Sequence, residues 1–432
     1  MTKPLKKVII ITYYWPPSGG SGVQRYLYFT KYLRQFGWEP VIFTVEDGAY
    51  SVVDEKLMDE VPRGVEVIKQ KSWEPNQLYK KITGRKKTAS IDSSIFKDQK
   101  KSLINSLAIW VRGNIFIPDA RLFWIKPSVK RLNKYIQNNR VDAIISTSPP
   151  QSTHLIANKV SKRNNIPWLA DFRDPWTDIG YFKELKLSRW AKNKHLKLEK
   201  MVMQNADSLL TVSKIWQKDF EKIRKSSVDY IPNGFESANI KENITPDKDF
   251  YTWSYVGVLT DDREPTILWE EIDELYKSNS EFANKFRLRF VGNISKQIQE
   301  NIKKYSFCEK VTFKGNIPKN ELNEVLYSSN VLLLIGIPSV RGVLPGKVFE
   351  YLNTKKFILN ISEENSEAED FLNKVKGGLS SSFKDRNKTK ENIVTLWQHH
   401  LDNKIVESIG LEKYSRENIT KELALILNRI TK

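Results

Sequence analysis

Short apolar runs alternate with longer stretches of helical periodicity along most of this chain. In the first half, the runs lie at residues 8–12, 40–45, 65–68, 141–147, 168–170, 206–212 and 228–233. In the second half, the clearest runs lie at residues 331–335 and 357–361, and further strands are expected at 251–259, 286–291, 311–313 and 377–381. Short continuous runs are typical of strands buried on both faces of a parallel sheet, with helices as the connections. The pattern predicts two doubly wound α/β domains.

The length of the chain and one polar segment place the domain boundary near the middle. A chain of 432 residues is too long for one ordinary core. Gly234 ends the first half, and the polar segment 237–249 has the composition of a linker. We therefore expect domains at residues 1–235 and 236–412, followed by a helical tail at about 413–432.

Composition indicates a folded protein of a reducing compartment. Apolar residues make up 40% of the chain, with 12 Trp, 17 Tyr and 20 Phe, which favours well-buried cores over disorder. Cys308 has no second cysteine to pair with. No apolar run approaches the roughly 18 residues that span a bilayer, and the N-terminal run resembles a first strand, not a signal peptide. We expect a cytoplasmic protein.

A net charge of +19 predicts an anionic partner: nucleic acid, an anionic membrane or a phosphorylated substrate. No zinc-finger or RRM signature supports nucleic acid. Residues 69–140 hold seventeen Lys/Arg against four Asp/Glu, interleaved with aromatic residues. Such a segment can lie in a membrane interface, with Trp110, Arg112, Phe123 and Trp124 as candidate contacts. The alternative is a core-facing helix with a solvated basic rim.

The clearest candidate chemistry follows the apolar run at 331–335. Pro345 and Gly346 open a short helix, and its first turn carries Lys347 and Glu350 on one face. A cation and free N–H groups at a helix start suit phosphate, and the carboxylate suits ribose hydroxyls. The alternative is an ordinary surface ion pair.

Polar residues also follow strands of the first half. Gly19 and Gly20 lie between the first strand and a helix, which suits either phosphate approach or a plain tight turn. His154 begins another helix, with Ser152 or Thr153 as its cap, and could act in acid–base chemistry, donor binding or packing.

The segment DFRDPWTD at the end of a predicted strand carries Asp171, Arg173 and Asp174. Either carboxylate could accept a proton or bind sugar hydroxyls, or both could be neutralised by Arg173 in a structural network. The adjacent acids Asp261 and Asp262 favour solvated loop residues over a metal site, so we expect no metal.

Three segments carry a resemblance to a known family. LPGKVFEYLNTKKFIL, at 344–359, resembles the donor-site segment of retaining glycosyltransferases of family 4. The segment 149–178 and PDARLFW, at 118–124, are similar to a bacterial subgroup that builds surface polysaccharides. The resemblance implies the GT-B fold, in which two Rossmann-like domains face across a cleft and the C-terminal helix packs back on the first domain.

The resemblance also implies roles for single residues. Arg263 and Lys347 would hold the donor diphosphate, because Val258 stands where the family usually has another arginine. Glu350 would hold the ribose, but Gly342 stands where the family has the glutamate that contacts the transferred sugar. The loops containing Asn293 and Ile317 would frame the base. Gly19 and Gly20 would face the donor phosphates, and Asp171 or Asp174 would act on the acceptor, although the family usually has histidine in place of Arg173.

The activity implied is transfer of a sugar from a nucleoside-diphosphate sugar, UDP favoured, to a lipid-linked saccharide. We expect retention, no metal or other cofactor, and a peripheral position on the cytoplasmic membrane face. The alternatives are an inverting GT-B transferase or a non-enzymatic protein that binds anionic membrane or nucleic acid.

Overall fold

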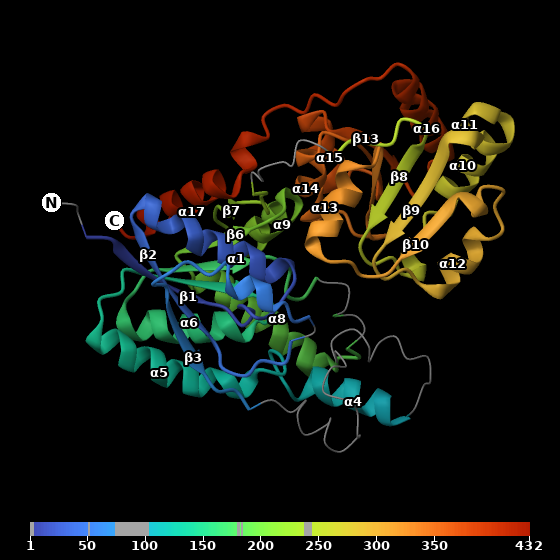
Figure 1. Ribbon diagram of the computed structural model, residues 1–432. Coiled ribbons are helices and arrows are strands. Elements are labelled where there is room, and N and C mark those ends of the chain that lie inside the picture. The colour runs from blue at the N-terminus through green and yellow to red at the C-terminus, as the bar shows by residue number, and fades with distance from the viewer. Residues whose placement is uncertain (1–3, 51, 74–102, 179–181, 183–184, 237–243) are drawn as a thin grey trace. The chain divides into compact units, whose positions relative to one another are not determined.

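The computed structural model describes residues 4–50, 52–73, 103–178, 182, 185–236 and 244–432. The chain divides into two compact units (Figure 1). The first contains Met1–Asn233 and Arg416–Lys432, and the second contains Gly234–Ser415. Among the described residues, no helix combines the length and apolarity that crossing a bilayer requires.

The first unit is built on a seven-stranded parallel sheet of order β3-β2-β1-β4-β5-β6-β7. Its strands are β1 (Lys6–Ile11), β2 (Trp38–Val45), β3 (Glu66–Gln70), β4 (Ala143–Ser148), β5 (Trp168–Phe172), β6 (Ser208–Thr211) and β7 (Asp229–Tyr230). Its helices are α1 (Ser21–Tyr32), α4 (Leu103–Asn114), α5 (Ile125–Asn138), α6 (Ser152–Asn164), α8 (Arg189–Asn205), α9 (Lys214–Arg224) and α17 (Arg416–Ile430). The chain order reverses between β1 and β4, which is where such sheets bind ligands.

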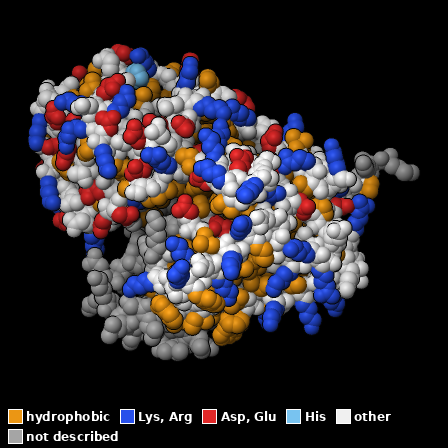
Figure 2. All heavy atoms as spheres, turned by 180° about the vertical axis from the view of Figure 1, so that it is seen from behind, with side chains coloured by type: hydrophobic (Ala, Val, Ile, Leu, Met, Phe, Trp, Pro, Cys, Tyr) orange, Lys and Arg blue, Asp and Glu red, His pale blue; other side chains and the backbone are white. Residues whose placement is uncertain are grey.

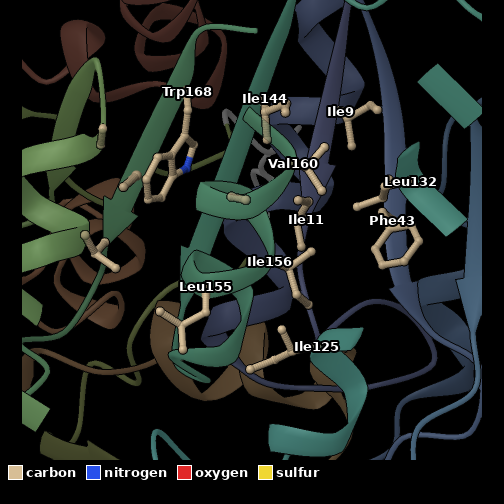
Figure 3. Close-up of a cluster of buried hydrophobic side chains, with 14 of the residues drawn as sticks. Ile9, Ile11, Phe43, Ile125, Leu132, Ile144, Leu155, Ile156, Val160 and Trp168 are labelled. Atoms are coloured by element: carbon tan, nitrogen blue, oxygen red, sulfur yellow. The ribbon is translucent and has the colours of Figure 1, made fainter. Parts of the chain in front are cut away.

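Two apolar cores cover the two faces of this sheet. On one face, Ile9 and Ile11 of β1 meet Ile156 and Val160 of α6 (Figure 3). On the other face, the alternate β1 residues Val8 and Ile10 lie in a core with α1 and α17. Successive strand residues point to opposite faces, so burial of both faces produces the continuous apolar runs of the sequence.

The second unit repeats the plan with six parallel strands in the order β10-β9-β8-β11-β12-β13. The strands are β8 (Tyr251–Val256), β9 (Phe286–Val291), β10 (Val311–Lys314), β11 (Val331–Ile335), β12 (Phe357–Ser362) and β13 (Gly378–Ser382). The helices are α10 (Thr266–Ser278), α11 (Ser280–Lys285), α12 (Lys296–Ile302), α13 (Lys319–Tyr327), α14 (Lys347–Asn353), α15 (Glu367–Val375) and α16 (Arg386–Leu401). Helices α10, α12 and α16 share one core with the sheet, and α14 and α15 share the other.

These two sheets confirm the predicted doubly wound α/β architecture. Helix α8 begins at Arg189, because the Ser188 hydroxyl accepts from the Ala191 N–H and caps the helix there. Helix α17 packs on α1 of the first unit, where the Arg416 guanidinium lies 3.4 Å from the centre of the Tyr28 ring.

Candidate functional site

Lys347 is the first residue of α14 and reaches the carboxyl end of strand β8. Its Nζ donates to the Val256 carbonyl oxygen at 3.1 Å and lies 4.3 Å from the centre of the Tyr255 ring. Gly257 follows with φ +132°, and a Cβ there would lie 3.6 Å from the Lys347 Nζ. The Lys347 side chain therefore packs against the end of β8, between the Tyr255 ring and the strand backbone.

This setting changes the charge behaviour of the lysine. Burial, and to a lesser extent the nearby Arg263 charge, lower the pKa of Lys347 from 10.5 to about 7, while Glu350 opposes both. A charge shifts the pKa of another group only when it lies nearby. Arg263 and Glu350 therefore lie close to Lys347, and the second unit brings together the three charged residues predicted to bind the donor. An ammonium held beside another cation gains most from an anionic ligand.

Arg263 lies in the short helical turn after β8 and is anchored to backbone. Its Nε donates to the Gly336 carbonyl oxygen at 2.9 Å, and its two Nη atoms donate to the carbonyl oxygens of Val258 and Ile335. These contacts join the loop after β8 to the end of β11. The guanidinium is therefore a fixed positive charge at the carboxyl edge of the sheet; its contact with a diphosphate stays a prediction.

The N-terminus of α14 contributes less positive potential than the sequence suggested. Gly346 is the N-cap of α14, as predicted, but the helix has only seven residues. A helix of under two turns has a small dipole, so the side chains of Arg263 and Lys347 supply most of the positive charge at this edge. Glu350 is exposed on the same helix, with its carboxylate available to solvent or ligand.

The two loops predicted to frame a base differ in their placement. The Asn293 carbonyl accepts from the Leu259 N–H at 3.0 Å, which ties this loop to the one after β8. Gly292, with φ +112°, is required there because a Cβ would lie 2.3 Å from the Gly257 carbonyl oxygen. Ile317 instead lines a cavity of about 540 Å³ beside β9 and β10, whose described lining residues do not include Lys347 or Arg263.

In the first unit, Asp171 lies inside strand β5 with none of its surface exposed. Its Oδ2 accepts from Arg25 Nε at 3.2 Å, from the Tyr26 hydroxyl at 2.7 Å and from Thr147 Oγ1 at 3.3 Å. Arg25 also donates to the carbonyl oxygens of Ile231 and Pro232. This geometry favours a structural role for Asp171, tying α1 and β5 to the last residues before the second unit.

Asp174 is in a different environment, in the loop after β5. It is half-buried, and its pKa is raised by burial and by Asp171 while Arg173 opposes the rise. Arg173 Nε donates to the Ser148 carbonyl oxygen at 3.0 Å. A Cβ on Gly22 would lie 2.2 Å from Arg173 Nη1, so the loop glycine leaves room for this guanidinium. Asp174 is the candidate carboxylate that combines a raised pKa with partial exposure.

The glycine loop before α1 has two distinct tasks. The Gly19 N–H donates to the Val52 carbonyl oxygen at 2.9 Å, and Gly20 is the N-cap of α1 with φ +98°. A positive φ is a conformation that glycine adopts readily, so the backbone explains why Gly20 is a glycine. This supports the tight-turn alternative of the sequence analysis.

His154 is a packing residue in this structure. It is completely buried, its Nδ1 shares a 2.7 Å hydrogen bond with Ser146 Oγ, and its ring stacks on Phe172 at 4.5 Å. Burial lowers its pKa to about 3, so the ring stays neutral at ordinary pH. This geometry supports the packing alternative; the acid–base or donor-binding role remains a prediction.

The cap of α6 was predicted wrongly. The N-cap position is Gln151, whose side chain makes no cap, and neither Ser152 nor Thr153 fills that role. Instead, Asp119 Oδ2 accepts from the Ser152 N–H and Oδ1 accepts from the Ser152 hydroxyl, both at 2.8 Å. A carboxylate from a distant segment therefore satisfies the helix start, which local sequence cannot reveal.

The predicted membrane contacts divide into surface and core residues. The prediction was wrong for Trp124, which is fully buried, stacks near Phe43 and donates its indole N–H to the Gln70 carbonyl oxygen at 3.1 Å. Trp110 and Phe123 are exposed. Arg112 is half-buried and lines a cavity of about 220 Å³.

Apart from Arg112, sequence reasoning singled out none of the polar residues of this cavity that are named below. Its lining includes Asp119 and Arg121, which belong to the PDARLFW segment, together with Trp176 and His195. The signal available was the resemblance of that segment to a family subgroup. Without the fold, nothing connected it to a histidine in α8.

Comparison with known proteins gives structural matches only. No protein-family model and no curated protein sequence matches the chain. Sucrose-phosphate synthase from Thermosynechococcus elongatus superposes with a TM-score of 0.62, at 14% identity over 98% of both chains. Anabaena HepE, solved in complex with UDP and glucose, gives 0.61 at 12% identity over 98% of this chain and 100% of that one. TarM gives 0.60 at 13% identity over 98% and 99%. At these identities the likeness establishes the architecture: two Rossmann-like units of the GT-B fold.

Proposed function

We propose that the protein is a glycosyltransferase that uses a nucleoside-diphosphate sugar, with UDP as the favoured nucleotide. The observation that carries the proposal is the charged cluster of Lys347, Arg263 and Glu350 at the carboxyl end of β8 and β11. The structural likeness to HepE, solved with UDP and glucose, supports the choice of nucleotide.

The chemistry would follow from the leaving group. The bond between the sugar C1 and the diphosphate oxygen breaks, and C1 forms a bond to an acceptor hydroxyl. The diphosphate gains negative charge in the transition state, so a fixed Lys347 ammonium with the Arg263 guanidinium near it stabilises the transition state more than the bound donor. Glu350 would accept hydrogen bonds from the ribose hydroxyls.

The first unit would supply the acceptor side. We assign Asp174, not Asp171, to the acceptor hydroxyl, because Asp171 is buried in an ion pair with Arg25. The raised pKa of Asp174 suits a carboxylate that takes up a proton. In a retaining reaction, the departing diphosphate can take that proton instead, and Asp174 then positions the hydroxyl.

We further propose retention, no metal requirement and a lipid-linked saccharide acceptor at an anionic membrane surface. The basic, aromatic-bearing segment from 69 to 140 and its exposed Trp110 and Phe123 support the last point. The sugar's anomeric configuration in the product decides between retention and inversion.

A binding screen followed by a turnover assay tests the proposal. UDP, GDP, ADP and CMP with their sugars are screened by thermal shift, where ligand at about 100 times its Kd adds about 2.7 kcal/mol of stability. We expect UDP-sugars to stabilise the protein and Lys347→Ala to lower turnover roughly a hundredfold. The absence of any stabilising nucleotide, or a near-normal rate for Lys347→Ala, would refute the proposed donor site.

A further inference from the structure

A small cavity lies at the carboxyl edge of the seven-stranded sheet, where doubly wound folds bind ligands. Its volume is about 220 Å³, below the about 300 to 1,000 Å³ of pockets for larger ligands, so it suits a single small group. The segments after β1, β4 and β5 contribute to it together with the end of α4 and with α8. The residues that matter below are Arg112, Phe116, Asp119, Arg121, Trp176 and His195.

The charged groups of the cavity favour an anion. The lining includes two arginines, Arg112 and Arg121, and a single carboxylate, Asp119. Both oxygens of Asp119 already accept hydrogen bonds, from the N–H and hydroxyl of Ser152 and from the Arg121 N–H. A ligand rich in hydroxyl donors would need acceptors that Asp119 no longer offers, whereas a phosphate needs donors alone.

His195 adds a neutral donor to this cavity. The Trp176 indole N–H donates to His195 Nδ1 at 3.0 Å, and because an indole can only donate, the neutral imidazole carries its proton on Nε2. The residue is 3% exposed, and Nε2 has no hydrogen-bond partner within the described part of the chain, although the Gly113 carbonyl is near enough to raise the pKa slightly. Burial outweighs this and lowers the pKa to about 4, so the ring remains a neutral N–H donor.

An aromatic patch continues from the mouth of the cavity. We define it as Trp73 and Phe123, which are 56% and 44% exposed; Trp110 and Ile115, in and just after α4, are 43% and 58% exposed. Phe116, which lines the cavity, lies 6.1 Å from Phe123 between ring centres, and Phe123 lies 4.8 Å from Trp73. Hydrophobic side chains gather with Lys and Arg over this end of the first unit (Figure 2). Exposed apolar surface of this kind marks an interaction site.

We propose that the cavity binds the phosphate group of an amphiphile whose hydrocarbon chain lies on the aromatic patch. Binding of free phosphate would not account for the exposed aromatic patch. Contact with a flat membrane surface would not account for a cavity with three buried or half-buried donors. The proposal rests on the proposed function, because it makes the acceptor of the transfer a saccharide carried on a lipid phosphate and places that phosphate beside the loop that carries Asp174 and Trp176.

Binding of three probes tests the assignment: farnesyl phosphate, farnesol and inorganic phosphate, each titrated calorimetrically into the full chain below the micelle concentration. We expect farnesyl phosphate to bind at least tenfold more tightly than either of the others, since each carries half of the recognised chemistry. Arg112→Gln should weaken farnesyl phosphate about tenfold. Arg163→Gln, an exposed arginine of α6 outside the cavity, should leave it unchanged.

A second variant and a second ligand separate the possible outcomes. Phe123→Ser should weaken farnesyl phosphate and leave inorganic phosphate unaffected. Equal affinity for phosphate and farnesyl phosphate, or an Arg112→Gln variant that binds farnesyl phosphate as wild type does, would overturn the proposal. Normal UDP binding without farnesyl phosphate binding would refute the proposed lipid-phosphate site but not the donor site. Farnesyl phosphate binding without any nucleotide binding would refute the donor site but not the lipid-phosphate site.

Discussion

Replacing Lys347 by methionine should stabilise the second unit and, at the same time, remove its affinity for UDP. Burial and the Arg263 charge lower the pKa of Lys347 from 10.5 to about 7 in the folded protein. Below about pH 7 the ammonium is therefore held in an unfavourable place, and a methionine of similar length lacks that charge. A residue that destabilises the free protein and strengthens ligand binding has the behaviour expected of a functional lysine.

The size of the effect follows from the pKa. One pKa unit is about 1.4 kcal/mol, so the fall from 10.5 to about 7 sets an upper bound of about 5 kcal/mol. Lys347 is half-buried, and solvent screening reduces this to about 2 kcal/mol, from which the lost hydrogen bond to Val256 subtracts about 1 kcal/mol. A net gain of about 1 kcal/mol raises the Tm of a unit of this size by roughly 2 to 4 °C.

The pH dependence has a defined sign. The pKa of Lys347 is lower in the folded than in the unfolded chain, so the unfolded chain binds more protons between about pH 7 and 10.5. The free energy of unfolding of the wild type therefore rises as pH increases from about 7 to 10.5, and it falls as pH decreases toward 7. The advantage of Lys347→Met should be largest at pH 6 and smaller at pH 9.

Differential scanning calorimetry at pH 6 and pH 9, with UDP titrations on the same samples, measures both effects. Lys296→Met, an exposed lysine at the start of α12, is the matched control and should change neither Tm nor UDP affinity. A variant with unchanged or lower Tm at pH 6 that still binds UDP as wild type does would contradict the reasoning.

Three further predictions concern the charge of Lys347, the two aspartates of the first unit, and the close approach of Gly292 to Gly257. UDP affinity should fall as pH rises through about 7, because Lys347 loses its proton there; an affinity constant between pH 6 and 9 would exclude its charge from binding. Asp171→Asn should destabilise the first unit by about 3 to 5 kcal/mol by leaving Arg25 buried without a counter-charge, whereas Asp174→Asn should keep the Tm and lower transfer; chemical denaturation and a transfer assay would reveal the opposite pattern if the assignment is wrong. Gly292→Ala should destabilise the second unit by about 1 to 3 kcal/mol, because φ is +112° and the methyl would meet the Gly257 carbonyl, while Gly315→Ala, with open space at its Cβ, should melt as wild type; equal melting of the two variants would argue against this close approach.

The sequence alone determined the two parallel sheets. Strands buried on both faces are apolar at successive positions, so β1 and β11 could be predicted to within a few residues of their observed ends. Lys347 and Glu350 could be paired from sequence because helical spacing is local.

Only the tertiary structure decided which polar residues are buried. Asp171 and Asp174 are three residues apart and look equivalent in the sequence, but strand β5 holds Asp171 inside the sheet, and the following loop leaves Asp174 partly exposed. Trp124 and Phe123 are neighbours, yet one is in the core and the other on the surface. Periodicity records local geometry, whereas burial of a given side chain depends on segments far away in the chain. Asp119 at the start of α6 and His195 beside Trp176 are contacts of that kind, and no local pattern encodes them.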